Sequence, residues 1–378
     1  MLKRFAALLL SLILLIPANA PAELDEDDLS IEEFIDLDEP EDGPGIVETD
    51  GSTTITITCT GDFTIGGDNY HHKNKKKESF YKELEENGGD ISFTMKNVAD
   101  ILRSDDMTLV NFEGTLTNTT YVPDNKNGND FLFNIDPEYV TVLTDNSIEA
   151  VSLANNHVMD HGTEGYEETK RTLYDAGVVF STAEDIGVYT VKGIQIAMLS
   201  YLCIDRYDKP VGGYQNLYEK VAADIAETKQ RYPIVIVSFH WGNELDYKPN
   251  ERQKKMGHLA VDSGADLVIG HHSHRFNPIE EYNGVYICYS LGNFCFSGNN
   301  KPKDMTSIMF QTRFRISKSG EISNTGFRII PIRISSLKER NNYTPTPLTD
   351  DMKIEGIIST MKSNGKGWGI EEYPLEWK

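Results

Sequence analysis

The chain has 378 residues, 39% of them hydrophobic, which is enough for one large domain with a full core plus appendages. Its formal net charge of −23 argues against nucleic acid as a partner, because the phosphate backbone would be repelled. An anionic cell-wall polymer stays compatible with this charge, since a metal site can bind such a polymer against the overall field.

The first 22 residues have the layout of a secretory signal peptide. Lys3 and Arg4 precede an apolar run at 5–16, and Ala20-Pro21-Ala22 then offers small residues for cleavage before Glu23. The alternative is an uncleaved membrane anchor, although the apolar run is short for a membrane span. In either case we expect an exported protein that works outside the cell or at its surface.

Residues 23–50 form an acidic segment. It contains 14 Asp or Glu and no Lys or Arg, so it repels itself and has little apolar surface to bury. We expect a disordered linker there, followed by a folded domain at 51–337. Residues 338–378 are polar and are expected to pack on that domain as a C-terminal extension with one short helix near 349–361.

From Thr53 the sequence alternates between short apolar runs and amphipathic segments, which predicts a layered α/β fold with a largely parallel centre. Strands are expected at 54–60, 107–112, 149–153, 194–200, 234–239 and 266–270. Helices are expected at 94–103, 137–145, 164–176, 217–230 and 251–263.

From Asn277 onward the pattern predicts antiparallel strands at 277–281, 285–289, 305–315 and 325–333, with turns such as Tyr282-Asn-Gly284 between them. We therefore expect the domain to end as a second sheet packed on the first.

The four cysteines, Cys59, Cys203, Cys288 and Cys295, match no zinc-ribbon or redox spacing. All lie in or beside predicted strands, so we expect buried free thiols. Export permits disulfides, and a bridge between Cys288 and Cys295 is the first alternative.

Polar side chains appear where several predicted strands end. Asp62 and Glu113 follow the first two strands, His240 ends the run at 234–239, and His272 and His274 follow the run at 265–269. Parallel strands bring their carboxyl ends to one edge of a sheet, where ligands bind. Carboxylate and imidazole groups gathered there suit a hard-to-borderline divalent metal. The pattern predicts a metal-dependent hydrolytic centre.

A second polar group follows the apolar residues 150–154. Asn156 offers a neutral carbonyl ligand, His157 could protonate a leaving oxygen, and Asp160 could orient that imidazole. An Asn-rich turn with a helix cap is the alternative interpretation.

The tract Gly270-His-His-Ser-His274 is the most specific single motif. In an extended segment residues i and i+2 face the same side, so His272 and His274 are expected to meet one metal pair while His271 faces away. Metal scavenging by an exported His-rich tract is the alternative.

Six short motifs between residues 58 and 296 together resemble the CapA family of poly-γ-glutamate capsule synthesis proteins, within the calcineurin-like metallophosphoesterase superfamily. They are Gly61-Asp62, Asn111-Phe-Glu113-Gly, Ser152-Leu-Ala-Asn-Asn-His157 with Asp160 and Gly162, His240-Trp-Gly, Gly270-x-His272-Ser-His274, and Tyr289-Ser-Leu-Gly-Asn-Phe294. No one motif is specific, but their combination and order are.

The resemblance implies a four-layer sandwich of two sheets flanked by helices, with a site for two divalent metals. By matching motifs, the implied ligands are Asp62, Glu113, Asn156, His240, His272 and His274. His157 becomes the implied acid, held by Asp160. The mixed oxygen and nitrogen ligands fit Mn, Fe or Zn.

The chain departs from the family pattern at two places. Thr64 stands where the superfamily has a histidine in its first motif, so one metal position is a ligand short. Gly66-Gly67-Asp68 replaces a basic residue that many members carry, which leaves substrate contacts there undefined.

The sequence thus predicts an exported, metal-dependent, phosphoesterase-like hydrolase that serves a capsule, poly-γ-glutamate or cell-wall polymer. Its expected partner is an anionic polymer or phosphoester substrate. Two alternatives remain. One is a non-catalytic metal-binding component of a membrane complex for capsule polymer synthesis or export, which the missing first-motif histidine favours. The other is a γ-glutamyl amide hydrolase using the same metal centre.

Overall fold

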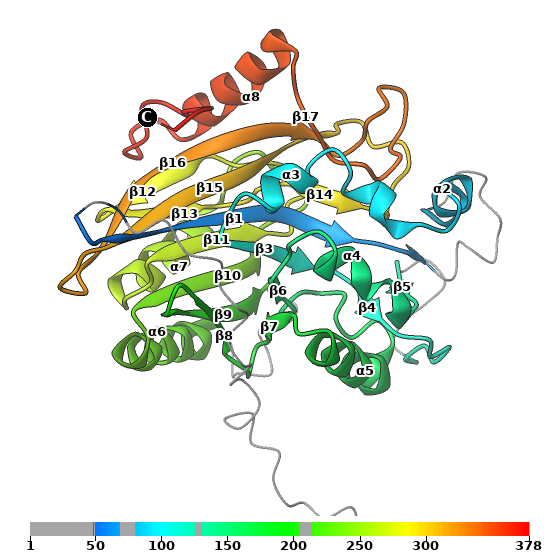
Figure 1. Ribbon diagram of the computed structural model, residues 1–378, viewed down its shortest axis with the longest axis horizontal. Coiled ribbons are helices and arrows are strands. Elements are labelled where there is room, and N and C mark those ends of the chain that lie inside the picture. The colour runs from blue at the N-terminus through cyan, green and yellow to red at the C-terminus, as the bar shows by residue number, and fades with distance from the viewer. Residues whose placement is uncertain (1–47, 49, 69–79, 125–130, 205–213, 378) are drawn as a thin grey trace, which may run out of the picture. The chain divides into compact units, whose positions relative to one another are not determined.

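The computed structural model describes residues 48, 50–68, 80–124, 131–204 and 214–377 (Figure 1). The chain divides into two compact units, Met1–Asp36 and Leu37–Lys378, and every described residue belongs to the second. The predicted signal peptide and nearly all of the predicted acidic linker lie outside the described residues. No helix in the described part combines the length and the apolar character that a membrane span requires.

The described chain is a mixed α/β fold built on two large sheets. The first sheet runs in the order β17 (Thr346–Pro347), β16 (Ile322–Arg333), β15 (Thr306–Ile316), β1 (Thr53–Thr64), β3 (Met107–Phe112), β6 (Ala150–Ser152) and β7 (Val179–Ser181), and β14 (Asn293–Phe296) also pairs with β1. Strands β1, β3, β6 and β7 are parallel, as the alternating sequence pattern predicted.

The second sheet runs in the order β12 (Ile279–Tyr282), β13 (Val285–Cys288), β11 (Leu267–His271), β10 (Ile234–Trp241), β9 (Ile194–Cys203) and β8 (Gly187–Val191). Its central strands β9, β10, β11 and β13 are parallel. A small third sheet joins β2 (Gly67–Asp68), β5 (Phe133–Ile135) and β4 (Thr115–Leu116).

One buried apolar cluster contains side chains from both large sheets, including Ile57 of β1, Leu109 of β3, Ile236 of β10 and Ile269 of β11. This cluster packs the two sheets against each other. Two further clusters contain strand residues together with helix residues, such as Leu173 of α5 (Gly162–Asp175) in one and Met256 of α7 (Glu251–Asp262) in the other. Burial of these apolar side chains is the main force that holds the layers together.

Helices connect the parallel strands. The N-terminal half contains α2 (Phe80–Glu86), η2 (Ile91–Thr94), α3 (Ala99–Leu102), η3 (Pro137–Val140), α4 (Thr141–Thr144) and α5. Helices α6 (Tyr214–Arg231) and α7 pack beside β9, β10 and β11 (Figure 1). At the start of α7 the Asn250 side chain accepts a bond from the Gln253 N–H, and the Gln253 side chain accepts one from the Asn250 N–H.

Helix α8 (Asp351–Asn364) confirms the helix predicted near 349–361. Asp350 caps its first turn, and its buried residues Ile357 and Met361 join the cluster between the sheets. In Figure 1 the helix lies above β16 and β15.

Two predicted helices are broken in the structure. Segment 94–103 divides into η2 and α3. Between them the Val98 N–H donates a 2.9 Å bond to the Met95 carbonyl, a tighter turn than that of an α-helix, and Met95 and Val98 are both fully buried. Segment 137–145 divides into η3 and α4, each only four residues long.

The prediction that the chain ends as a separate second sheet is wrong. Strand β13 pairs parallel with β11, and β15 pairs antiparallel with β1, so the C-terminal strands complete both existing sheets. The local pattern had indicated the hairpins correctly. Asn283 and Gly284 have φ values of 50° and 81°, as a two-residue hairpin turn requires.

All four cysteines are free and buried, as expected from the sequence. Burial raises the pKa of the Cys203 thiol to about 12, which makes it a poor nucleophile.

Candidate metal centre

The site lies where strands of both large sheets end. Asp62 lies near the end of β1 and Glu113 directly follows β3, whereas Asn156 follows β6 in the same sheet. The histidines come from the other sheet: His240 from β10, and His272 and His274 from the loop after β11. Packing of the two sheets therefore brings carboxylates from one sheet against imidazoles from the other.

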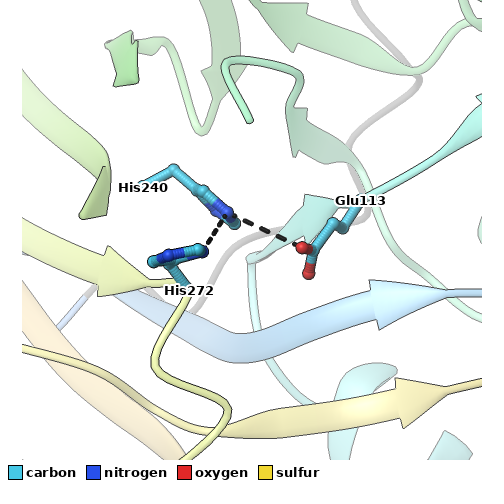
Figure 2. Close-up of side chains that lie close together, drawn as sticks. All are labelled: Glu113, His240 and His272. Carbon is cyan, nitrogen blue, oxygen red and sulfur yellow. Dashed lines mark hydrogen bonds and ion pairs between the residues drawn. The ribbon is translucent and has the colours of Figure 1, made fainter. Parts of the chain in front are cut away.

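Two groups of ligand atoms share the Glu113 carboxylate. One group joins Glu113, His240 and His272, and the other joins Asp62, Glu113 and His274; within each group the atoms lie within 4.8 Å of one another. Figure 2 shows the first group, in which both imidazoles and the carboxylate point toward a common space. A carboxylate common to two such groups is placed to bridge two cations.

Three groups approach one nitrogen of His240. Its Nε2 atom lies 2.6 Å from Asn156 Oδ1, 3.1 Å from His272 Nδ1 and 3.6 Å from Glu113 Oε1. One ring nitrogen carries at most one proton and cannot satisfy all three neighbours. Such crowding of nitrogen and oxygen atoms is compatible with ligation of a common ion.

The two oxygens of Glu113 are buried and have no hydrogen-bond partner among the described residues. Burial, and next the charge of Asp62, raises the pKa of Glu113 well above its usual range. A buried carboxylate without partners is costly unless a cation or proton balances it. These residues therefore fit a divalent metal, both in the kind of ligand atom and in their unmet need for positive charge.

Asp62 is held from two sides. Its Oδ1 accepts a 2.9 Å bond from Asn111 Nδ2, and its Oδ2 lies 3.0 Å from His274 Nδ1. Burial alone would raise the pKa of Asp62, but the hydrogen bond and charge of His274, the charge of His271 and the Asn111 bond together lower it. Burial opposes protonation of His274, yet the carboxylates of Glu113 and Asp62 raise the pKa of His274 to about 9.

Glycine is required beside Asp62 because two backbones meet there. A Cβ on Gly61 would lie 1.9 Å from the carbonyl oxygen of Gly292, and the Asp62 N–H donates to that same carbonyl at 2.9 Å. The Gly-Asp motif thus fixes the carboxylate at a point where the backbone of β1 closely approaches the segment before β14.

His272 and His274 reach the site by a route that the sequence did not predict. Strand β11 ends at His271, and the next residues have φ values of 89° for His272 and 52° for His274. The argument from strand alternation is therefore wrong, although both side chains do reach the centre. Non-glycine residues in the left-handed region carry strain that packing must offset, and such strain gathers at functional sites.

His271 faces away from the centre, as predicted. Its ring nitrogens lie 3.4 Å from Ser238 Oγ and 3.2 Å from the carbonyl of Thr60. Burial, the largest cause, holds the pKa of His271 below its usual range. For His240, burial and then the neighbouring His272 ring hold the pKa well below its usual range.

His157 lies at the edge of the same centre. Its Nδ1 is 2.7 Å from Asp160 Oδ2, and its Nε2 is 4.0 Å from Glu113 Oε1. The Asp160 oxygen also accepts a 2.8 Å bond from the N–H of Phe133, whose ring packs edge-on against His157 at 4.6 Å. The imidazole is therefore fixed with one nitrogen on Asp160 and the other directed at the carboxylate.

Thr64 replaces the expected histidine but contacts the site indirectly. It is buried, and its hydroxyl donates a 2.9 Å bond to the carbonyl of Glu113. Thr64 therefore supplies no ligand atom; its hydroxyl instead supports the backbone of Glu113.

Two supporting residues were not assigned a role from the sequence. Asn111 joins Asp62 to His240, with its Nδ2 3.3 Å from the Nδ1 of His240, and Asn293 Oδ1 lies 2.8 Å from His274 Nδ1. Asn111 interrupts the apolar run Leu109-Val-Asn-Phe112, and a buried amide in such a run needs hydrogen-bond partners. This interruption was the signal available in the sequence.

Residues 56–298 match the family described as bacterial capsule synthesis protein PGA_cap. The PGA biosynthesis protein CapA of Bacillus subtilis (strain 168) is 32% identical over 314 residues, which cover 78% of this chain and 77% of that protein. The capsule biosynthesis protein CapA of Bacillus anthracis is 25% identical over 345 residues, covering 86% and 77%. A hypothetical protein from Thermus thermophilus, known from its crystal structure, aligns with a TM-score of 0.44 and 11% identity, covering 73% of this chain and 98% of that one.

The family match covers more than half of the chain and contains all six residues that the sequence had suggested as ligands. Together with the relative from Bacillus subtilis, it shows that the chain belongs to the CapA family of bacterial capsule synthesis proteins.

Proposed function

We propose that this protein is an exported, metal-dependent, phosphoesterase-like hydrolase that acts in the synthesis of a poly-γ-glutamate capsule or a related cell-wall polymer. The observation that carries the proposal is the pair of ligand groups that share Glu113, whose buried oxygens lack hydrogen-bond partners among the described residues. The capsule context is supported by relatives named for PGA and capsule biosynthesis.

The fold supports a metallophosphoesterase-like architecture. One apolar cluster joins the two large sheets, and helix residues pack in the clusters on the opposite sides. We interpret this arrangement as the four-layer sandwich expected from the family resemblance.

In this proposal, His240, His272 and Asn156 would hold one cation, Asp62 and His274 would hold a second, and Glu113 would be available to both. Two divalent cations would lower the pKa of a water nucleophile and neutralise charge on the group being transferred. The mixed oxygen and nitrogen ligands suit Mn, Fe or Zn.

The chain's own residues supply the rest of the chemistry. His157 is held by Asp160 at Nδ1, so its Nε2 is left to carry a proton toward a substrate oxygen at the edge of the centre. Asp160 positions that ring. The N–H of Phe133 fixes Asp160 in turn, which keeps the proton donor in one orientation.

Export is supported by the N-terminal sequence, where Lys3 and Arg4 precede an apolar run and small residues. The substrate that fits this setting is an anionic polymer or a phosphoester on the outer side of the membrane.

The proposal is tested by metal analysis of the purified full chain combined with hydrolysis assays. The substrates are a generic phosphodiester, a phosphomonoester and γ-glutamyl peptides, each with and without added Mn, Fe or Zn. We expect bound metal and metal-dependent cleavage of a phosphoester. Cleavage of γ-glutamyl peptides alone would favour an amide hydrolase, and bound metal without any cleavage would favour a non-catalytic component of a synthesis complex.

A further inference from the structure

A basic groove lies outside the proposed metal centre, between helix α8, the start of strand β15 and the end of strand β16. Its cavity volume is about 730 Å³. Three lysines and one arginine line it: Lys303, Lys338, Lys353 and Arg333. The chain as a whole carries a net charge of −23, so a cluster of four basic side chains has the opposite sign to the overall charge.

The cations of the groove are available to a ligand. Lys303, Lys338 and Lys353 are exposed, and none of the four basic residues forms an ion pair with a residue that the structure describes. Some lysines elsewhere do form ion pairs, as Lys220 does with Asp224 and Lys229 with Asp266. Unpaired like charges repel one another, so a site of this kind is expected to have an anionic ligand.

The one carboxylate among the described residues that line the groove is already engaged. Asp304 accepts a hydrogen bond from the hydroxyl of Tyr247, and it also accepts 2.8 Å and 2.7 Å bonds from the N–H and hydroxyl of Thr306. Arg333 is held in place because its guanidinium donates to the carbonyls of Ser335 and Ser336 at 2.7 Å and 3.0 Å. The groove therefore presents a fixed guanidinium and three exposed ammonium groups.

Apolar side chains also line the groove. Phe276, Met305 and Ile357 contribute to its wall, and Phe276 and Ile357 are each only 3% exposed. Because Phe276 and Ile357 expose so little surface, the groove would recognise a ligand mainly through its cations, and a chain with a regular series of carboxylates matches them in charge.

The groove is joined to the proposed metal centre by continuous chain. Phe276 lies two residues beyond His274, and its ring packs edge-on against Tyr247 at 5.3 Å. The guanidinium of Arg275 lies over the same Tyr247 ring at 5.7 Å. A polymer bound in the groove would thus lie along the segment that carries a proposed ligand.

From these observations we infer that the groove binds a polycarboxylate chain. If the proposed capsule function holds, that chain is γ-linked polyglutamate. The groove would hold the polymer during its synthesis or processing, while the metal centre carries out separate chemistry.

The test is binding of fluorescently labelled poly-γ-glutamate of defined length to the purified full chain, measured by fluorescence polarisation. The variant Lys303→Glu with Lys338→Glu reverses two charges in the groove. The matched control, Lys255→Glu with Lys318→Glu, makes the same change in net charge at exposed positions that do not line the groove. We expect the groove variant to bind about tenfold more weakly or worse, and the control to bind nearly as the parent.

Three results would overturn the inference: no binding by the parent, equal weakening by both double variants, or displacement by polyphosphate more readily than by polyglutamate of equal charge. Increasing salt should weaken binding by the parent, because the contacts are between exposed charges. The His272→Ala variant separates the two proposals. It should lose metal and keep polymer binding, whereas the groove variant should keep its metal and any hydrolysis of a small phosphodiester.

Discussion

Glu113 is the residue on which the proposed metal chemistry depends. It belongs to both candidate ligand groups, it is fully buried, and neither of its oxygens has a hydrogen-bond partner among the described residues. Two neighbours hold candidate ligands in place: Asn111 donates to Asp62, and Asn293 Oδ1 lies 2.8 Å from His274 Nδ1. Such supports usually decide how tightly a metal is bound.

The first prediction separates proton transfer from metal binding. His157→Ala should keep its metal and fold while losing about 10²–10⁴-fold in rate on a substrate that the parent cleaves. His272→Ala should lose metal. The loss from His157→Ala should be large for an alkyl leaving group and small for nitrophenolate, which needs no proton. Metal analysis and rates on both substrates test this; metal loss in His157→Ala, or full activity on the alkyl ester, would contradict it.

The second prediction concerns Asp105, which precedes β3. Burial raises the pKa of its carboxyl to about 8. Its Oδ2 accepts a 2.8 Å bond from the Thr108 hydroxyl, and its Oδ1 has no partner among the described residues. Because the folded-state pKa lies above the unfolded value of about 4, the stability from this group is complete below about pH 4 and is lost as pH rises toward 8.

Asp105→Asn should therefore become steadily more stable relative to the parent between about pH 5 and 8. Thermal melts of both proteins across this range measure the difference. Burial also raises the pKa of Glu149, whose carboxylate accepts from the Thr108 N–H and which remains in the variant, so the pH dependence should be reduced and not abolished. If the difference in melting temperature between the two proteins does not change with pH, the pKa of Asp105 is not raised as described.

At the scale of elements, the site depends on strand ends that meet at close range. A Cβ on Gly270 in β11 would lie 2.2 Å from the carbonyl of Tyr289, just as one on Gly61 would meet Gly292. These two glycines allow β1, which carries Asp62, and β11, which precedes the histidine loop, to approach the backbone of residues 289–292 after β13. The ligands are thus positioned by backbone contacts between strands, and not by their own loops alone.

The third prediction tests the packing of α8. Met361 is fully buried in the cluster between the sheets, whereas Met352 in the same helix is 81% exposed. Met361→Ala should lower the free energy of unfolding by about 2–5 kcal/mol through lost contacts and a cavity. Met352→Ala, the matched control, should change it by less than about 0.5 kcal/mol. Chemical denaturation measures both, and equal effects would show that α8 is not docked as described.

Most elements could be predicted because each depends on local pattern. The run Ile234 to Phe239 is long, apolar and ends in polar residues, and it forms β10. The short strand β14 could not be predicted, because its four residues become a strand only by pairing with β1. Which sheet the last strands join also depends on partners that are distant in the sequence. For this reason a separate sheet was expected, whereas these strands join the two large sheets.

At the scale of the whole molecule, the candidate site exists only because two sheets pack face to face. The strand-end residues could be selected from the sequence, since abrupt polar residues after apolar runs are visible there. Their division into two groups around Glu113 could not, because it depends on how β10 and β11 lie against β1 and β3. The left-handed backbone at His272 and His274 was equally hidden, since nothing in their side chains favours it.

The fourth prediction concerns the acidic N-terminal segment. Asp50, at its end, accepts bonds from Ser52 and pairs with Arg315, so the folded domain includes this residue. Residues 23–49 contain no basic residue and few that could join a core. A shortened chain that begins at Asp50 should therefore melt at the same temperature as the longer one in the same buffer. A clear drop in melting temperature would show that the segment contributes to folding.

The central proposal is that Glu113 would lie between two bound metal ions, and anomalous diffraction from crystals grown with Mn²⁺ tests it most directly. We predict two anomalous peaks about 3.5–4 Å apart, with the Glu113 carboxylate between them. One peak should lie against His240 and His272, and the other against Asp62 and His274. A single peak, no peak, or peaks away from these side chains would contradict the account.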